Sequence, residues 1–152
     1  MGPRVFAAAL IACAIGCKSE EQFNREFIEK ELASLDTALA AGNETRVVTS
    51  CAVLEGTSVN MPPALAERIA RGCFVEAPRL ILQRGIANVV ENKRKHPDPE
   101  LVGLNCAELF VPGALQTLAK HPTTDPALQK LADEYTRLCP AEAAKARAGA
   151  AG

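Results

Sequence analysis

The sequence predicts an all-α protein, a small bundle of about six short helices stapled by disulfides. Hydrophobic residues make up 48% of its 152 residues and aromatic residues only 4%, and an alanine- and leucine-rich composition favours helix over sheet. Apolar side chains recur at steps of three and four through most of the chain, which is the helical period. Glycines, prolines and capping residues divide these stretches into short pieces, and the length suffices for one domain with a core.

The first helix is expected over residues 18–41, with residues 18–22 as a flexible tether in an alternative interpretation. Its charged residues fall on the opposite face from the apolar stripe, as in a half-buried helix. Gly42 is expected to end it, and Asn43 can cap the next helix. The apolar stripe consists of Phe23, Phe27, Ile28, Leu32, Leu35 and Leu39.

Two helices are expected before a central proline. The first covers residues 44–55 and stops at Gly56, and the second opens at Pro62-Pro63, because proline is tolerated in a first helical turn. Pro78 then breaks or kinks the chain, so this helix and the next, at about 79–94, are either separate or one kinked rod. The residues expected to face inward are Val47, Val48, Cys51, Leu54, Leu65, Ile69, Cys73, Phe74, Ile81, Leu82, Ile86, Val89 and Val90.

Three further helices are expected in the last third, at 99–111, 113–120 and 126–139. Asp98-Pro99 and Asp125-Pro126 each combine a capping residue with a proline suited to the first helical position. Residues 141–152 contain no large apolar side chain, and we expect a frayed or disordered tail. The stripes expected to face inward are Val102, Cys106 and Leu109, followed by Leu128, Leu131, Tyr135 and Leu138.

A faint internal repeat suggests two degenerate helical-hairpin units. The pattern Val47-x-x-x-Cys51-Ala-x-Leu54 recurs as Val102-x-x-x-Cys106-Ala-x-Leu109. Each copy is followed by Pro-Ala-Leu at the start of a helix that carries or ends at a second cysteine. Two copies are too few for a solenoid, and chance could produce them in a chain of this composition.

The amino-terminal segment has the features of an export signal. Arg4 and the amino terminus supply positive charge, and Val5 to Gly16 is apolar. Twelve apolar residues are too few to span a bilayer comfortably and match a signal-peptide core.

The end of this segment, Ala14-Ile15-Gly16-Cys17, resembles the lipobox of bacterial lipoproteins. The resemblance implies a signal peptide at 1–16, a lipid on the Cys17 thiol with a further amide-linked chain such as palmitate, and a lipidated tether at 17–22. Ala14 departs from the usual Leu, Val or Ile, and the alternative at Cys13 leaves a shorter apolar core. By analogy, Lys18 implies sorting to the periplasmic face of the outer membrane. The sequence is also compatible with an ordinary secretory leader.

Four more cysteines, Cys51, Cys73, Cys106 and Cys139, are expected to form structural disulfides, because exported chains meet an oxidising compartment. Four cysteines allow three pairings, and the repeat favours Cys51–Cys73 and Cys106–Cys139. Cys51 lies near a helix end and Cys73 about three turns into the next helix, so the first pair requires a steep crossing or a returning loop. Zinc ligation is disfavoured because close Cys pairs are absent. Redox-active thiols and free buried thiols are also compatible with the sequence.

No catalytic motif is recognisable. His96 and His121 both precede proline, and neither has a nucleophile or carboxylate at a catalytic spacing. The net charge of −1 gives no nucleic-acid footprint, and no cofactor motif is present. We therefore expect a lipid-anchored envelope module that binds a protein or small ligand at the membrane surface, and not an enzyme. An enzyme with a dispersed site and a structural or assembly lipoprotein are the competing hypotheses.

Overall fold

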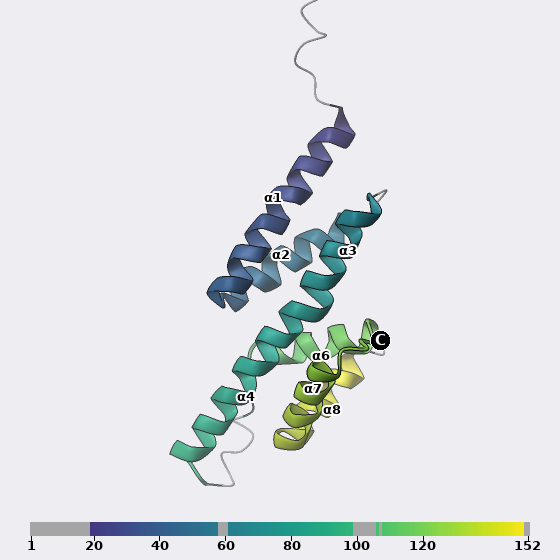
Figure 1. Ribbon diagram of the computed structural model, residues 1–152. Helices are drawn as coiled ribbons and strands as arrows, with labels where there is room; N and C mark the ends of the chain where they lie inside the picture. The colour runs from purple at the N-terminus through teal and green to yellow at the C-terminus, as the bar shows by residue number, and fades with distance from the viewer. Residues whose placement is uncertain (1–18, 58–60, 99–105, 107, 151–152) are drawn as a thin grey trace, which may run out of the picture.

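The computed structural model describes residues 19–57, 61–98, 106 and 108–150, and all regular secondary structure in these ranges is helical, as the sequence predicts. Counting α3, η1 and α4 as one continuous rod, this part of the chain contains six helical rods (Figure 1). The elements are α1 (Glu20–Ala41), α2 (Glu44–Gly56), α3 (Pro63–Arg71), the π-helical turn η1 (Gly72–Glu76), α4 (Ala77–Lys95), α6 (Val111–Lys120), α7 (Pro126–Leu138) and α8 (Pro140–Ala150).

A long rod made of α3, η1 and α4 runs through the molecule (Figure 1). Of the two alternatives expected at Pro78, two separate helices or one kinked rod, the single rod is correct. In a regular α-helix the ring of Pro78 would clash with the carbonyl of Phe74. The wider π turn just before it, in which the amide of Ala77 bonds to the carbonyl of Gly72, relieves this clash and lets the helix continue.

The amino-terminal half packs α1 and α2 against the first part of this rod. Gly42 adopts a left-handed conformation, with φ of 65°, and ends α1, while the Asn43 side chain accepts a hydrogen bond from the Arg46 amide to cap α2. The hydrophobic core of this half consists of Ile28, Leu32, Leu35, Ala38, Val47, Cys51, Leu54, Leu65, Ile69, Cys73 and Ala77.

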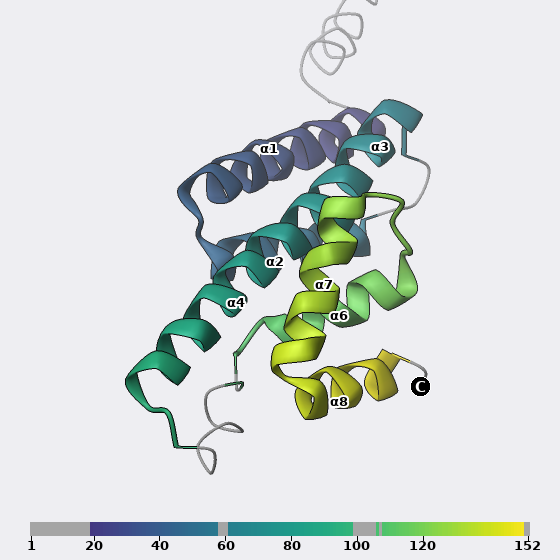
Figure 2. The same ribbon diagram turned by 60° about the horizontal axis from the view of Figure 1, so that its bottom comes forward.

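In the carboxy-terminal half, α6 and α7 pack against the second part of the rod, and α8 packs on α6 and α7 (Figure 2). Asp125 caps α7 with hydrogen bonds from the amides of Ala127 and Leu128, as its sequence position predicts. The core of this half consists of Ile81, Leu82, Ile86, Val89, Cys106, Val111, Ala114, Leu115, Leu128, Tyr135, Cys139, Ala143 and Ala146.

The prediction of a helix at 99–111 is wrong at its carboxy-terminal end. Cys106 lies in a turn, Leu109 and Phe110 lie in a bend, and α6 begins only at Val111. Pro112 explains the boundary, because it has no amide hydrogen to close a preceding helical turn and is well suited to the first turn of a new helix. Leu109, expected to face inward, is 80% exposed. Residues 99–105 and 107 lie outside the described part of the chain.

The prediction of a disordered tail at 141–152 is also wrong. Residues 140–150 form α8, which packs against α6 and α7, and both Ala143 and Ala146 are buried. Alanine is the best helix former, and its small side chain lets helix backbones approach closely. A face of alanines can therefore dock without a large apolar anchor.

The beginning of α1 differs from expectation in two ways. Ser19 and Gln22 form a reciprocal capping box, so the helix starts at Glu20, inside the expected tether. Phe23 is 64% exposed and Phe27 is 41% exposed, although both belong to the predicted apolar stripe. The buried part of the stripe begins at Ile28, and the first two turns of α1 leave their aromatic face uncovered among the described residues.

Candidate functional site

The Cys51–Cys73 disulfide joins α2 to the π turn of the rod. Its sulfur atoms are 2.10 Å apart and its Cα atoms 5.4 Å apart, so the predicted pairing is confirmed. α2 contacts all three parts of the rod, α3, η1 and α4, and Cys51 lies beside Cys73. Closing a loop of 22 residues stabilises the fold by about 3 kcal/mol in the chain-entropy model.

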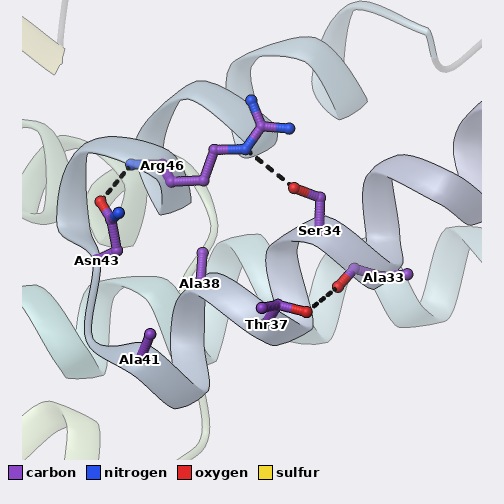
Figure 3. A pocket seen from close by; sticks show the side chains of 7 residues that line it. All are labelled: Ala33, Ser34, Thr37, Ala38, Ala41, Asn43 and Arg46. Atoms are coloured by element: carbon purple, nitrogen blue, oxygen red, sulfur yellow. Dashed lines mark hydrogen bonds between the residues drawn. The ribbon is translucent and has the colours of Figure 1, made fainter.

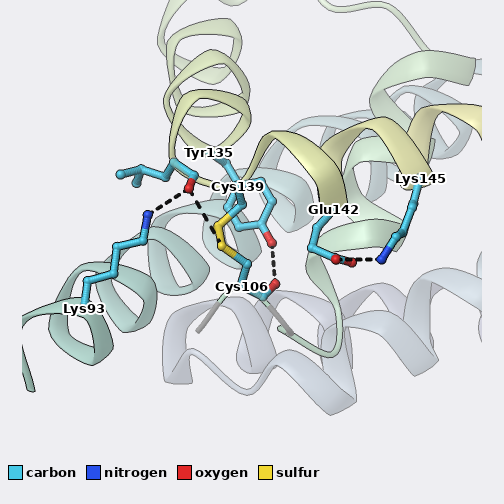
Figure 4. Close-up of a disulfide and its surroundings, with 7 residues drawn as sticks. Lys93, Cys106, Tyr135, Cys139, Glu142 and Lys145 are labelled. Atoms are coloured by element: carbon cyan, nitrogen blue, oxygen red, sulfur yellow. Dashed lines mark hydrogen bonds and ion pairs between the residues drawn. A yellow bond between two sulfur atoms is a disulfide. The ribbon is translucent and has the colours of Figure 1, made fainter. Parts of the chain in front are cut away.

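The Cys106–Cys139 disulfide, which confirms the second pairing, joins a turn to the end of α7, with 2.04 Å between the sulfurs. Figure 4 shows the groups around it. The hydroxyl of Tyr135 donates to the carbonyl of Cys106 at 2.9 Å, and Nζ of Lys93 donates to the carbonyl of Leu138 at 2.8 Å. These two bonds satisfy carbonyls that have no helical partner, one in a turn and one at a helix end.

The hydroxyl of Tyr135 is less acidic than that of an exposed tyrosine. Burial raises the pKa of its hydroxyl to about 12, and the nearby carboxylates of Glu108 and Glu142 add to the effect. The neutral hydroxyl is thus held as a hydrogen-bond donor well above ordinary pH. Tyr135 has a structural role here, because its donor is used by the Cys106 carbonyl.

Asp125 connects α7 to the rod. Its carboxylate accepts from Arg79 of α4 in addition to the two amides at the start of α7. The hydrogen bond from the Leu128 amide, followed by that from Ala127 and the charge of Arg79, holds the pKa of Asp125 below its usual value. This carboxylate therefore links the start of α7 to α4, and all of these contacts are structural.

One surface depression, between α1 and α2, has a volume of about 380 Å³ (Figure 3). Its polar groups already satisfy one another. Nε of Arg46 donates to the Ser34 hydroxyl at 2.9 Å, Asn43 accepts from the Arg46 amide, and the Thr37 hydroxyl donates to the Ala33 carbonyl. Arg46 also pairs with Glu31 at 3.2 Å. We interpret this depression as a helix–helix joint and not as a binding site.

A second depression, which we call the central groove, lies where α2, the rod and the start of α6 meet. Its volume is about 240 Å³. The rod and the disulfide form its floor, while α2 and α6 form its walls. Most of its lining is apolar, and Val48 and Leu109 are among the large exposed hydrophobic side chains of the described ranges. The lining residues are Val48, Cys51, Ala52, Glu55, Cys73, Ala77, Pro78, Ile81, Leu109, Phe110, Gly113, Ala114 and Thr117.

A third depression, the His121 hollow, meets the central groove at Glu55, which lines both. It encloses about 390 Å³. The imidazole of His121 stacks on the ring of Phe74, with centroids 3.7 Å apart and planes 3° from parallel. The other residues lining the hollow are Leu54, Met61, Ala66, Ile69 and Ala70.

Another depression lies at the start of α1 and has a volume of about 660 Å³. Phe27 and Ile28 line it together with Met61 and several polar residues. Met61 also lines the His121 hollow. Met61 and Glu55 therefore link these three depressions, because each lines two of them.

The residues singled out in the sequence have different places in this structure. The four core cysteines are brought together in pairs, which removes them as zinc ligands or free thiols. His96 and His121 end different helices, α4 and α6, and only His121 lines a hollow. Cys13 and Cys17 lie outside the described residues.

The sequence alone does not indicate the groove residues Glu55, Phe110 and Gly113. A signal for one wall was present, because residues 48, 51, 52 and 55 share one helical face, next to the buried face of α2 that Val47 and Leu54 occupy. One face of α2 packs into the core, and the adjacent, largely apolar face lines the central groove.

Across the described ranges, no group of three or more His, Cys, Asp or Glu side chains is arranged to hold a metal ion. Within the same ranges, none of the helices combines the length and hydropathy needed to cross a membrane. No protein-family model, no curated protein and no solved structure matches the chain.

Proposed function

We propose that this protein is a lipid-anchored module of a bacterial cell envelope that binds a partner protein at the membrane surface through the central groove. The observation that carries the binding role is the groove itself. Val48 on α2, at 37% exposure, and Leu109 in the bend before α6, at 80%, contribute large apolar side chains to its lining from two separate segments. Exposed apolar surface gathered in a concavity is typical of a binding site, whereas single exposed apolar residues are ordinary.

The envelope location is supported by two features. The segment Ala14-Ile15-Gly16-Cys17 resembles a lipobox, and pairing of all four cysteines of the domain suits an oxidising compartment. The attached lipids would supply the two signals needed for stable membrane attachment, and Lys18 favours the outer membrane by analogy with the class.

The start of α1 fits a position close to that membrane. Phe23 follows Cys17 by six residues, and Phe27 follows one helical turn later. Both rings are exposed, so an anchored Cys17 would bring this aromatic face to the bilayer surface. The central groove, built from α2 and α6, would remain available to a partner.

A small apolar ligand in the His121 hollow is the second candidate. Its volume of about 390 Å³ lies in the range of small-molecule sites, and the stacked rings of Phe74 and His121 form a flat aromatic wall. This candidate keeps the anchor and the compartment and changes only the class of partner.

The first experiment has two arms. Mass spectrometry of the mature amino terminus should find a lipid-modified Cys17; an unmodified terminus, or a start at Cys13, would refute the anchor as proposed. Affinity capture from envelope extracts should recover a partner with the native chain and lose it with Leu109→Asp. The matched control is Val90→Asp, because Val90 is also an exposed apolar residue, at 50%, and lines none of the depressions described above. Equal capture by both variants would contradict binding through the groove.

A further inference from the structure

The central groove has the form of an open trough and not of an enclosed cavity. Its volume of about 240 Å³ is below the 300–1,000 Å³ of usual small-molecule sites. Leu109 on its rim is largely exposed. Such a site can bury a few side chains from one face of a partner, but it cannot enclose a whole ligand.

The walls of the trough permit close approach of another backbone. Ala52 on α2 and Gly113 on α6 are small, and a Cβ atom added at Gly113 would meet nothing within 4 Å. Small residues on a surface let a helix backbone approach closely, and larger apolar residues on either side then receive its side chains. An amphipathic helix laid in an apolar groove presents a row of apolar side chains at i, i+3, i+4 and i+7.

The charge in the trough has one sign. Glu55 is exposed, lines both the groove and the adjoining hollow, and forms no hydrogen bond or ion pair with the described residues. Neither depression has Lys or Arg in its lining. Two other carboxylates of the same half do have basic partners, Glu31 with Arg46 and Asp36 with Arg68. An unpaired carboxylate at the edge of apolar surface favours a partner that supplies a cation.

We infer that the occupant of the central groove is an amphipathic helix of a partner protein, whose apolar face carries a flanking lysine or arginine for Glu55. This inference rests on the proposed function and specifies its partner. The apolar face fills the trough between Val48 and Leu109, and the basic side chain selects the orientation of the helix.

Two synthetic helical peptides with the same leucine-rich face provide the test. One carries lysines beside that face, and the other carries glutamates at the same positions. Each is titrated against the full chain in lipid nanodiscs, with empty nanodiscs of the same lipid as the blank. We expect the native protein to bind the lysine peptide about fivefold more tightly, the effect of one exposed ion pair at the upper end of its range.

Variants at Glu55 assign the preference to this groove. Glu55→Gln should remove the preference and Glu55→Lys should reverse it. The matched control is Glu67→Lys, because Glu67 is exposed on α3 and lines neither depression; it should keep the native preference. Equal binding of both peptides to the native chain, or reversal by Glu67→Lys, would overturn the inference.

The outcome separates this inference from the proposed function. If neither peptide binds while the Leu109-dependent capture of an envelope partner persists, the occupant is not such a helix, and the inference fails alone. If the capture also proves independent of Leu109, the groove is not the binding site and both fail.

Discussion

The two halves of the molecule share one rod and one kind of staple, but they use the staple differently. Cys51–Cys73 connects two helices within their length, so it fixes an angle of crossing between elements that are already regular. Cys106–Cys139 connects a turn to a helix end, where Tyr135 and Lys93 provide additional bonds. The first staple supports the floor of a surface groove, and the second attaches the turn at Cys106 to the end of α7.

The largest expected effects come from removing the staples. Replacing Cys106 and Cys139 together by Ala should cost about 4 kcal/mol, and replacing Cys51 and Cys73 about 3 kcal/mol, because the loops close 33 and 22 residues. Each double replacement should cost little more than either single one, since the same bond is lost. Chemical denaturation measures these values.

Hydrogen exchange sharpens the comparison. Loss of Cys106–Cys139 should lower amide protection mainly in α6, α7 and α8, and loss of Cys51–Cys73 mainly in α1 and α2. A uniform loss of protection across both halves would contradict two separately stapled cores. Four free thiols in the denatured, unreduced protein prepared from the envelope would contradict the staples themselves.

Glycines on the rod should give the next largest effect. A Cβ atom at Gly85 would lie 2.5 Å from Cγ2 of Val111, and one at Gly72 would lie 2.8 Å from Cδ2 of Leu35. Val111 is stiff because it is β-branched, whereas the end of Leu35 can move. Gly85→Ala should therefore cost about 1–3 kcal/mol, and Gly72→Ala less.

Gly113→Ala is the control for this pair, because a Cβ atom there meets open space. In helix α6 it should be neutral or stabilise by up to about 1 kcal/mol. Thermal unfolding of the three variants measures the order of their stabilities. A larger loss of stability at Gly72 than at Gly85 would contradict the expectation that the contact of Gly85 with Val111 yields less than that of Gly72 with Leu35.

Loss of one buried hydrogen bond should give the smallest of these stability effects. Tyr135→Phe removes the hydroxyl donor from the Cys106 carbonyl, which keeps its hydrogen bond from the Glu108 amide at 2.9 Å, and it should cost about 1 kcal/mol. In the amino-terminal half, Ser50→Ala removes a bond of 2.7 Å to Glu31 but leaves that carboxylate paired with Arg46. We expect its cost to be about 0.5 kcal/mol, the lower end for one hydrogen bond, and a larger cost than for Tyr135→Phe would contradict the comparison.

The same tyrosine predicts a pH dependence. Because the folded pKa of about 12 lies above the ordinary value of 10, stability is fully present below pH 10 and falls as the pH rises toward 12. Tyr135 is the only tyrosine in the sequence, so its absorbance titration reports on this group alone. A titration midpoint near 10 in the folded protein would contradict its burial, and Tyr135→Phe should remove this part of the alkaline loss.

The sequence predicts the helical class and both cysteine pairings because periodicity, caps and parity are local or countable features. The faint repeat gives the correct pairs even though its copies differ in structure. Leu54 is buried in a helix, while its counterpart Leu109 is exposed in a bend. Pro63 and Pro126 do play equivalent roles, each opening a helix with a buried leucine two residues later.

The features that the sequence does not predict depend on contacts between distant segments. Nothing local distinguishes Phe23 from Leu32, yet only Leu32 meets the rod. The alanines of α8 become a buried face only because α6 and α7 offer a surface of matching shape. The central groove likewise requires the crossing of α2 over the rod and the placement of α6, neither of which periodicity can supply.

Site-specific photo-crosslinking in cells tests the central claim most directly. A photoreactive residue at Ala52, on the wall of the groove, should give a crosslinked adduct with an envelope protein, whereas one at Ala87, an exposed alanine of α4 outside its lining, should not. The adduct at position 52 should disappear when Leu109→Asp is added and persist when Val90→Asp is added. Equal adducts at both positions, or none at position 52 in a correctly anchored and disulfide-bonded chain, would contradict a binding role for the central groove.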